Sequence, residues 1–186
     1  MEELDVKIVV TIIAAIVSFI GLIIAKDHKI SEFRQCWIND FRADIAALMG
    51  CVSNISSKFI LADKESESES IDVMKFIENA HETYDEAHRL IYKLKLMLNP
   101  KKDHDLITAI YTVESMIMSA EKMRDSKYYH NATEELYSLS HQTLKNEWTR
   151  VKKGEAVFHF TKWVLVFGIV LLLGSYVVDI YSALGS

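Results

Sequence analysis

Two acidic–histidine pairs come closest, among the side chains of this sequence, to the spacing of a metal site. Glu78 precedes His81 by three residues, and Asp85 precedes His88 by the same interval. Di-iron sites in helical bundles take such pairs from two different helices and add carboxylates from the others. Here both pairs fall on one predicted helix, and the chain has no matching pair elsewhere. We therefore expect ordinary histidines and predict neither a metal site nor a cofactor.

Motifs for nucleophilic, phosphate-binding or zinc chemistry do not occur in the chain. It has no Gly-rich phosphate loop, no zinc-type pairing of cysteine and histidine, and no Ser-His-Asp or Cys-His arrangement. We expect no enzyme activity and no catalytic residue. Cys36 and Cys51 lie on one predicted helix, too far apart to bridge, and are expected to be reduced thiols.

Two apolar segments near the ends of the chain define its class. The chain has 186 residues, half of them hydrophobic, and a formal net charge of −5, which gives no uniformly basic surface for nucleic acid. Residues 6–25 contain one charge, Lys7, and residues 157–178 contain only Lys162. About 20 such residues span a hydrocarbon core of roughly 30 Å, so we predict two transmembrane helices. A signal peptide is the alternative for the first, but acidic residues precede it and no cleavage site follows.

Basic residues flank each apolar segment on the side that faces the middle of the chain. They are Lys26, Lys29 and Arg34 after the first segment, and Lys145, Arg150, Lys152 and Lys153 before the second. No Lys or Arg follows the second segment. The positive-inside rule therefore places residues 26–156 in the cytoplasm as a central domain and both termini outside.

The central segment begins with two amphipathic stripes of helical spacing. The first consists of Ile30, Phe33, Trp37, Phe41, Ile45, Leu48, Val52, Ile55 and Phe59. No Pro or Gly separates it from the first span, so the two are predicted to form one helix. The acidic run DKESESES, residues 63–70, is interpreted as a loop. The second stripe runs from Val73 to Leu98 and is stopped by Asn99-Pro100.

Two further stripes complete this segment. Asp103 is expected to cap a third helix, whose stripe is Leu106, Ile110, Val113, Ile117 and Ala120. After a break near residues 126–131, a fourth helix contains Leu136, Leu144, Trp148 and Val151 and continues into the second span. Short connections favour antiparallel neighbours. The predicted fold is an all-α membrane protein, in which two transmembrane helices are continuous with a cytoplasmic antiparallel four-helix bundle.

This helix order gathers basic residues at the membrane end of the bundle. We call them the basic collar: Lys26, Lys29, Arg34, Lys93, Lys95, Lys101, Lys102, Arg150, Lys152 and Lys153. So many like charges repel one another unless an anion neutralises them. One explanation is topology signalling together with attraction to anionic lipid headgroups. The other is a site for an anionic ligand such as a nucleotide or oligonucleotide.

Each predicted span also carries a stripe of small or weakly polar residues. The first stripe is Thr11, Ala14, Ser18, Gly21 and Ala25, and the second, repeating every seven residues, includes Thr161, Gly168 and Ser175. Small residues permit close packing of helices in lipid. Alternatively, such stripes line a pore. Two spans are too few to enclose a conduit, so conduction requires a homo-oligomer.

Three stretches resemble a known group of proteins: KISEFRQCWINDFRADIA from Lys29, KLMLNPKKDHDLI from Lys95 and EWTRVKKGE from Glu147. Together they cover about a fifth of the chain. They are similar to bacterial two-span membrane proteins with a helical cytoplasmic core, including toxic effectors of anti-phage defence such as the Hailong-type channel effector. The resemblance implies an oligomeric channel of the bacterial inner membrane, with periplasmic termini. It also implies control by a nucleotide or oligonucleotide that a partner enzyme makes.

All three stretches fall at the membrane end of the predicted bundle, where their polar and aromatic residues are expected to converge. The candidate ligand-binding residues are Arg34, Gln35, Trp37, Asn99, Lys101, Lys102, His104, Trp148, Arg150 and Lys152. Arg and Lys suit phosphates, while a Trp ring can stack on a base or serve as a core or interface anchor.

Three functions remain in competition at this point. The first is a regulated oligomeric effector, either an ion channel or a membrane-disrupting toxin. The second is a non-conducting membrane-anchored helical scaffold that docks a protein partner, and the third is a metal-dependent enzyme. The small-residue stripes, the continuous helices and the basic collar favour the first.

Overall fold

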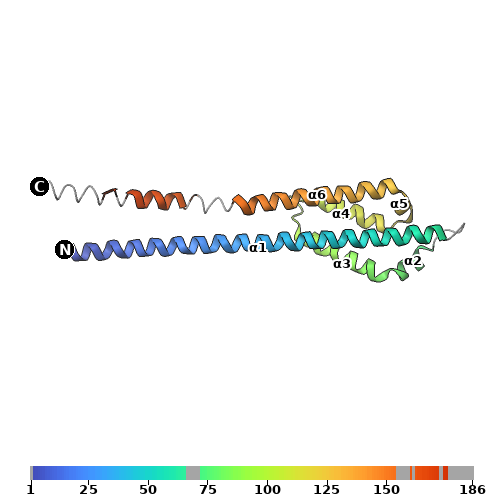
Figure 1. Ribbon diagram of the computed structural model, residues 1–186, viewed down its shortest axis with the longest axis horizontal. Coiled ribbons are helices and arrows are strands. Elements are labelled where there is room, and N and C mark those ends of the chain that lie inside the picture. Colours follow the sequence, from blue (N-terminus) through green and yellow to red (C-terminus); the bar gives the residue numbers. More distant parts are fainter. Residues whose placement is uncertain (1, 66–71, 154–159, 161, 172–173, 176–186) are drawn as a thin grey trace. The chain divides into compact units, whose positions relative to one another are not determined.

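The protein is helical throughout the part that the computed structural model describes, which comprises residues 2–65, 72–153, 160, 162–171 and 174–175 (Figure 1). The helices are α1 (Glu2–Glu65), α2 (Val73–Asn79), α3 (His81–Met97), α4 (His104–Ile117), α5 (Ala120–Arg124) and α6 (Ser126–Lys153). A short apolar helix, Lys162–Leu171, follows. The predicted all-α class is confirmed. Residues 66–70 of the predicted acidic loop, Thr161 and several residues of the second predicted span lie outside the described residues.

The chain divides into two compact units. The first unit is Met1–Gln35 with Thr149–Ser186, and the second is Cys36–Trp148. The two long helices, α1 and α6, each contribute residues to both units. The second unit therefore corresponds to most of the predicted cytoplasmic segment, and the first contains both apolar segments.

α1 is a single helix of 64 residues. The predicted continuity between the first apolar segment and the first amphipathic stripe is therefore confirmed. The helix also runs on through Glu65, so the assignment of residues 63–65 to a loop was wrong. Asp63 is held in the helix by Arg124 of α5, whose Nη2 lies 2.8 Å from Asp63 Oδ1. This hydrogen-bonded guanidinium lowers the pKa of Asp63.

A single hydrophobic core occupies the second unit, and α1, α2, α3, α4, α5 and α6 all contribute to it. Figure 1 shows α3, α4 and α6 alongside the C-terminal half of α1. The predicted stripes supply most of this core. Its fully covered members include Phe41, Leu48, Ile55 and Phe59 of α1, Ala87, Ile91 and Leu94 of α3, Ile110, Val113 and Ile117 of α4, and Leu136 of α6. Burying this apolar area is the main source of stability of the unit.

Contacts along α1 show the direction of the helices that pack on it. Near the start of the second unit, Asp44 of α1 accepts a hydrogen bond from Lys93 of α3 at 2.8 Å. Near the end of α1, Phe59 meets Phe76 of α2 edge to face, with ring centroids 5.4 Å apart. Residue numbers rise along one helix as they fall along the other, so α1 and the α2–α3 segment are antiparallel.

α3 and α4 are antiparallel as well. The Tyr84 hydroxyl donates to the Ile117 carbonyl at 2.8 Å, and Lys95 Nζ lies 2.8 Å from Glu114 Oε2. The first contact joins the start of α3 to the end of α4. Because Tyr84 is buried, desolvation of its phenolate raises its pKa to about 12, which keeps the hydroxyl protonated as a donor.

The second stripe is divided between two helices, although its spacing predicted one. The break falls at Ala80, where φ is −114° and ψ is 12°. The Nδ1 of His81 lies 3.0 Å from the Glu78 carbonyl oxygen, so a side chain occupies part of the backbone hydrogen-bond ladder. Such insertion is a recognised cause of helix kinks. Ala80 itself remains buried, which explains why the apolar spacing continues across the break.

Two expected helix boundaries differ in detail. Asp103 stands at the N-cap position of α4, but its carboxylate makes no capping hydrogen bond and instead accepts one from the Asn99 N–H at 2.9 Å. The break expected near residues 126–131 lies at Asp125, after the short helix α5. Asp125 Oδ1 accepts from the N–H groups of Lys127 and Tyr128, which satisfies the exposed donors at the start of α6.

The core predicts a sharp difference between two leucines of α1. Leu48 is fully buried and Leu61 is 60% exposed. Leu48→Ala should lower the free energy of unfolding by about 2–5 kcal/mol, because it removes buried methyl groups and leaves a cavity. Leu61→Ala should change it by no more than about 0.5 kcal/mol. Chemical denaturation in detergent, followed by circular dichroism, measures both, and equal effects would contradict the assigned core.

Candidate functional site

The N-terminal part of α1 is apolar on every side. Among the described residues, α1 is the one helix that is both long enough and apolar enough to cross a membrane. None of the residues in its most apolar stretch is buried. The exposed large side chains are Ile8, Val10, Ile12, Ile13, Val17, Phe19, Leu22 and Ile24. A helix that is hydrophobic all round and lacks protein cover suits a lipid environment. Twenty residues of helix, the length of the first predicted span, measure about 30 Å.

The second apolar segment is described only in part. Its helical piece, Lys162–Leu171, is shorter than a membrane span, so the described residues contain one candidate span where the sequence predicted two. Most large side chains of this piece are also exposed, with Trp163 at 67% and Phe167 at 66%, whereas Leu165 and Ile169 are partly buried. The surface chemistry of the two apolar segments is therefore the same.

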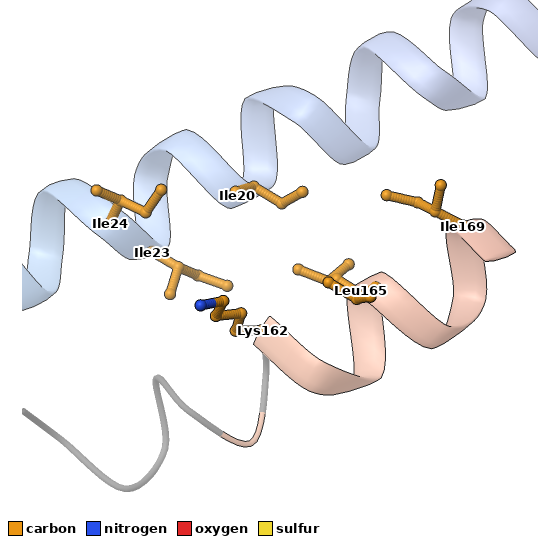
Figure 2. Close-up of a pocket in the computed structure, with 7 residues that line it drawn as sticks. Ile20, Ile23, Ile24, Lys162, Leu165 and Ile169 are labelled. Atoms are coloured by element: carbon orange, nitrogen blue, oxygen red, sulfur yellow. The ribbon is translucent and has the colours of Figure 1, made fainter.

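An apolar groove separates these two segments within the first unit. Figure 2 shows Ile20, Ile23 and Ile24 of α1 on one side, and Lys162, Leu165 and Ile169 on the other; Val166 also lines the groove. Lys162 brings the only charged side chain to this lining. A lysine at this position, next to the end of an apolar helix, can extend its ammonium group toward the polar interface.

The small-residue stripes do not form the facing surfaces of that groove. Gly21 and Gly168 are absent from its lining, and an added Cβ at either glycine would meet nothing within 4 Å. The Thr11 hydroxyl donates to the Lys7 carbonyl of its own helix at 2.8 Å. Branched aliphatic side chains therefore line the gap between the two segments. The predicted roles of the small stripes in packing or pore lining stay predictions, as do those of Ala14, Ser18, Ala25 and Ser175.

The candidate ligand-binding residues are distributed over both units. Arg34, Gln35, Arg150 and Lys152 belong to the first unit, whereas Trp37, Asn99, Lys101, Lys102, His104 and Trp148 belong to the second. Within the second unit, Lys102 Nζ lies 2.6 Å from Oε1 of Glu147 on α6. The structure therefore brings the α3–α4 connection next to the α6 turn that carries Trp148.

The α3–α4 connection is a closed loop. The Asn99 side chain accepts hydrogen bonds from the N–H groups of Lys101 and Lys102, and the Asn99 carbonyl accepts from Lys102 and Asp103. Pro100 has no N–H, and the Asn99 N–H is bound to the Asp103 carboxylate. These backbone donors are all used within the loop. Two side chains that could hold an anion here, those of Lys101 and His104, are exposed.

The two candidate tryptophans differ in their surroundings. Trp37 packs against the hydrophobic core and stacks on Phe41, with ring centroids 5.0 Å apart and planes 9° apart. That contact covers one face of the Trp37 ring and favours the anchoring role over the stacking of a base. Trp148 is 45% exposed.

Carboxylates from other helices pair with three lysines of the basic collar, whereas the binding of an external anion by the candidate residues stays a prediction. Besides Lys102, two collar lysines meet an acid from another helix: Lys93 with Asp44, and Lys95 with Glu114, each at 2.8 Å. Asp44 and Glu147 are buried. The sequence contains a sign that both carboxylates are buried and paired, because each lies on or beside an apolar stripe. A charge at such a position is costly unless an opposite charge or a hydrogen bond compensates it.

No group of three or more potential metal-ligating side chains occurs among the described residues. His81, from the first of the acidic–histidine pairs, directs Nδ1 at the backbone carbonyl of Glu78. Cys36 and Cys51 are free thiols, and burial is the main cause of a raised pKa at Cys51.

Comparison with known proteins identifies no relative. No protein-family model matches the chain, and no match was found among the curated proteins or the solved structures.

The contact between Lys102 and Glu147 generates a prediction about coupling. Their side chains are 50% and 10% exposed, whereas those of the surface pair Arg89 and Glu86 are 61% and 42% exposed. A double-mutant cycle with Lys102→Ala and Glu147→Gln should give a coupling energy of about 1–3 kcal/mol, because the carboxylate is shielded from water. The same cycle on Arg89 and Glu86 should give a clearly smaller coupling energy, because water screens this exposed pair. Denaturation of the full chain in detergent measures both, and equal values would refute the assigned role of burial.

Proposed function

We propose that the protein is an oligomeric membrane effector, acting as an ion channel or a membrane-disrupting toxin under the control of its helical second unit. The observation that carries this proposal is the unbroken course of α1, from residues that are apolar on all sides into the hydrophobic core of the second unit. Such a helix can transmit a change in the packed unit to the membrane, since rigid elements carry coupling between distant sites.

In this proposal residues 6–25 and 157–178 both span the membrane, with the termini outside and the second unit in the cytoplasm as an antiparallel four-helix bundle. The exposed apolar side chains of both segments support the two spans, and the one-sided basic flanks support the orientation. The bacterial inner membrane and a role in anti-phage defence rest on the resemblance of the three sequence stretches.

Self-association follows from the small number of spans. The groove between the two segments is lined by aliphatic side chains and Lys162, and neither small-residue stripe glycine lines it. Because the space around Gly21 and Gly168 is open, their faces can receive a helix from another copy of the chain. In an oligomer one stripe then packs against a neighbour while the other faces water.

In this proposal an anionic nucleotide or oligonucleotide regulates the protein by binding Lys102. Its side chain is half exposed, so a phosphate can approach it and compete with Glu147. A ligand shifts an equilibrium only by binding one state more tightly than another. Release of Glu147 in the bound state provides such a difference, because this contact ties the α3–α4 loop to α6.

The non-conducting scaffold is the second candidate function. It is favoured by the acid partners of Lys93, Lys95 and Lys102, which reduce the need for an anionic ligand. The two candidates differ in whether the membrane becomes permeable.

The test is the membrane potential of cells that express the chain alone. The effector proposal expects depolarisation, and expects Ser18→Leu and Gly168→Leu to abolish it because a bulky side chain blocks the approach of helices. Val17→Leu, which changes an exposed residue beside the stripe, should leave depolarisation intact. All variants must be present in the membrane at equal amounts, as measured by immunoblot. An unchanged potential with the wild-type chain would support the scaffold instead.

A further inference from the structure

An exposed surface with two tyrosines lies on α3 and α4 of the second unit. Tyr92 is 62% exposed, Leu96 87% and Tyr111 54%. Leu96 has the highest exposure of the large hydrophobic side chains for which the structure gives one. Tyr92 and Leu96 are four residues apart on α3, so their side chains are neighbours on one helix face. We call Tyr92, Lys95, Leu96 and Tyr111 the tyrosine face.

Lys95 organises this face. Its Nζ lies 3.7 Å from the ring centroid of Tyr111 and 5.3 Å from that of Tyr92, within reach of both cation–π interactions. The same nitrogen bonds to Glu114 at 2.8 Å, and the Lys95 side chain is only 15% exposed. The Lys95 ammonium group therefore restrains the rings of Tyr92 and Tyr111 from the side that faces the protein. Rings fixed in this way lose little conformational entropy when a partner covers them.

The charge of the tyrosine face is balanced internally. Glu114 compensates Lys95, and the other members are uncharged. A two-fold symmetric contact sets the same patch of each copy against itself, so a patch with net charge would repel its own image. The tyrosine face meets this requirement. The α3–α4 connection, which exposes Lys101 and Lys102, does not.

The size of the face also limits what it can do. The two tyrosines offer at most about 300–500 Å² of surface, since a fully buried aromatic residue covers about 150–250 Å², and Leu96 adds to this. A stable interface needs about 800 Å² per partner. The tyrosine face is thus large enough for the centre of an interface, and sufficient for copies that the membrane segments already hold close together.

We propose that the tyrosine face contacts a second copy of this chain. The inference extends the proposed oligomer, because it names a surface of the second unit through which the copies meet. Leu96 of each copy packs against the tyrosine rings of the other copy. The Lys95–Glu114 pair of each copy lies near the centre of this contact, behind the rings of Tyr92 and Tyr111.

Site-specific photocrosslinking of the full-length chain in its membranes tests this contact. A photoreactive benzoylphenylalanine in place of Leu96 should give a covalent homodimer after illumination. The same probe in place of Leu61, which is 60% exposed on α1, should give at least fivefold less. With the probe in place of Tyr92, Leu96→Asp should reduce the crosslink several-fold, and Leu61→Asp should leave it unchanged. Helix content measured by circular dichroism confirms that each variant is folded.

Three results would overturn the proposal. Crosslinks from position 96 to lipid alone would place the face on the membrane, and crosslinks to a different protein alone would make it a docking surface for that protein. No crosslink at all would leave the face open to solvent. The membrane potential, measured on the same cells, separates this inference from the proposed function. Depolarisation without a homodimer crosslink removes only the tyrosine-face contact, and a crosslink without depolarisation removes only the effector function.

Discussion

The uninterrupted backbone of α1 is the constraint on which the remaining features depend. One helix of 64 residues has to satisfy two different surroundings. Its N-terminal part exposes apolar side chains on every side, whereas beyond Gln35 the buried residues lie on one face only. The change from an all-round to a one-sided apolar pattern is what separates a lipid-facing helix from a packed amphipathic one. The packed part then positions the other helices of the second unit.

Charge is arranged around that packing by pairs between helices. Lys93, Lys95 and Lys102 each reach a carboxylate on a different helix, and two of these acids, Asp44 and Glu147, are buried. A buried carboxylate without its partner is costly, so each pair favours one register of its helices. The same pairs leave the tyrosine face neutral and keep the closed α3–α4 loop attached to α6. Of these three lysines, Lys102 is also a candidate ligand-binding residue.

Local pattern predicted the helices well and their interruptions poorly. The stripes identified Phe41, Leu48, Ile91 and Ile110 as core residues, because apolar spacing reports which face is buried. The break at Ala80 was missed, since this residue is buried and the apolar spacing continues across it without a sign of the interruption. Phe33 belongs to the stripe by spacing but is 64% exposed, because it precedes the packed unit.

The candidate ligand site was harder to predict than the core. Its basic residues are evident in the sequence, but their partners come from distant positions: 49 residues separate Asp44 from Lys93, and 45 separate Lys102 from Glu147. An apolar stripe indicates that Asp44 and Glu147 need partners, but spacing along one helix does not identify those partners. The tyrosine face was missed for a related reason. Tyr92 and Tyr111 lie on separate helices and off the apolar stripes, and only the folded unit shows that Lys95 lies between them.

The proposed coupling requires α1 to be one rigid helix between its exposed apolar part and its packed part. Amide hydrogen exchange of the full-length chain in lipid nanodiscs, read residue by residue from 20 to 41, tests this. The account predicts slow exchange without a gap across residues 26–36, since every amide there is bonded within the helix. Fast exchange confined to a few consecutive residues of that stretch would reveal a flexible joint. A joint there would contradict the claim that the second unit acts on the membrane through α1.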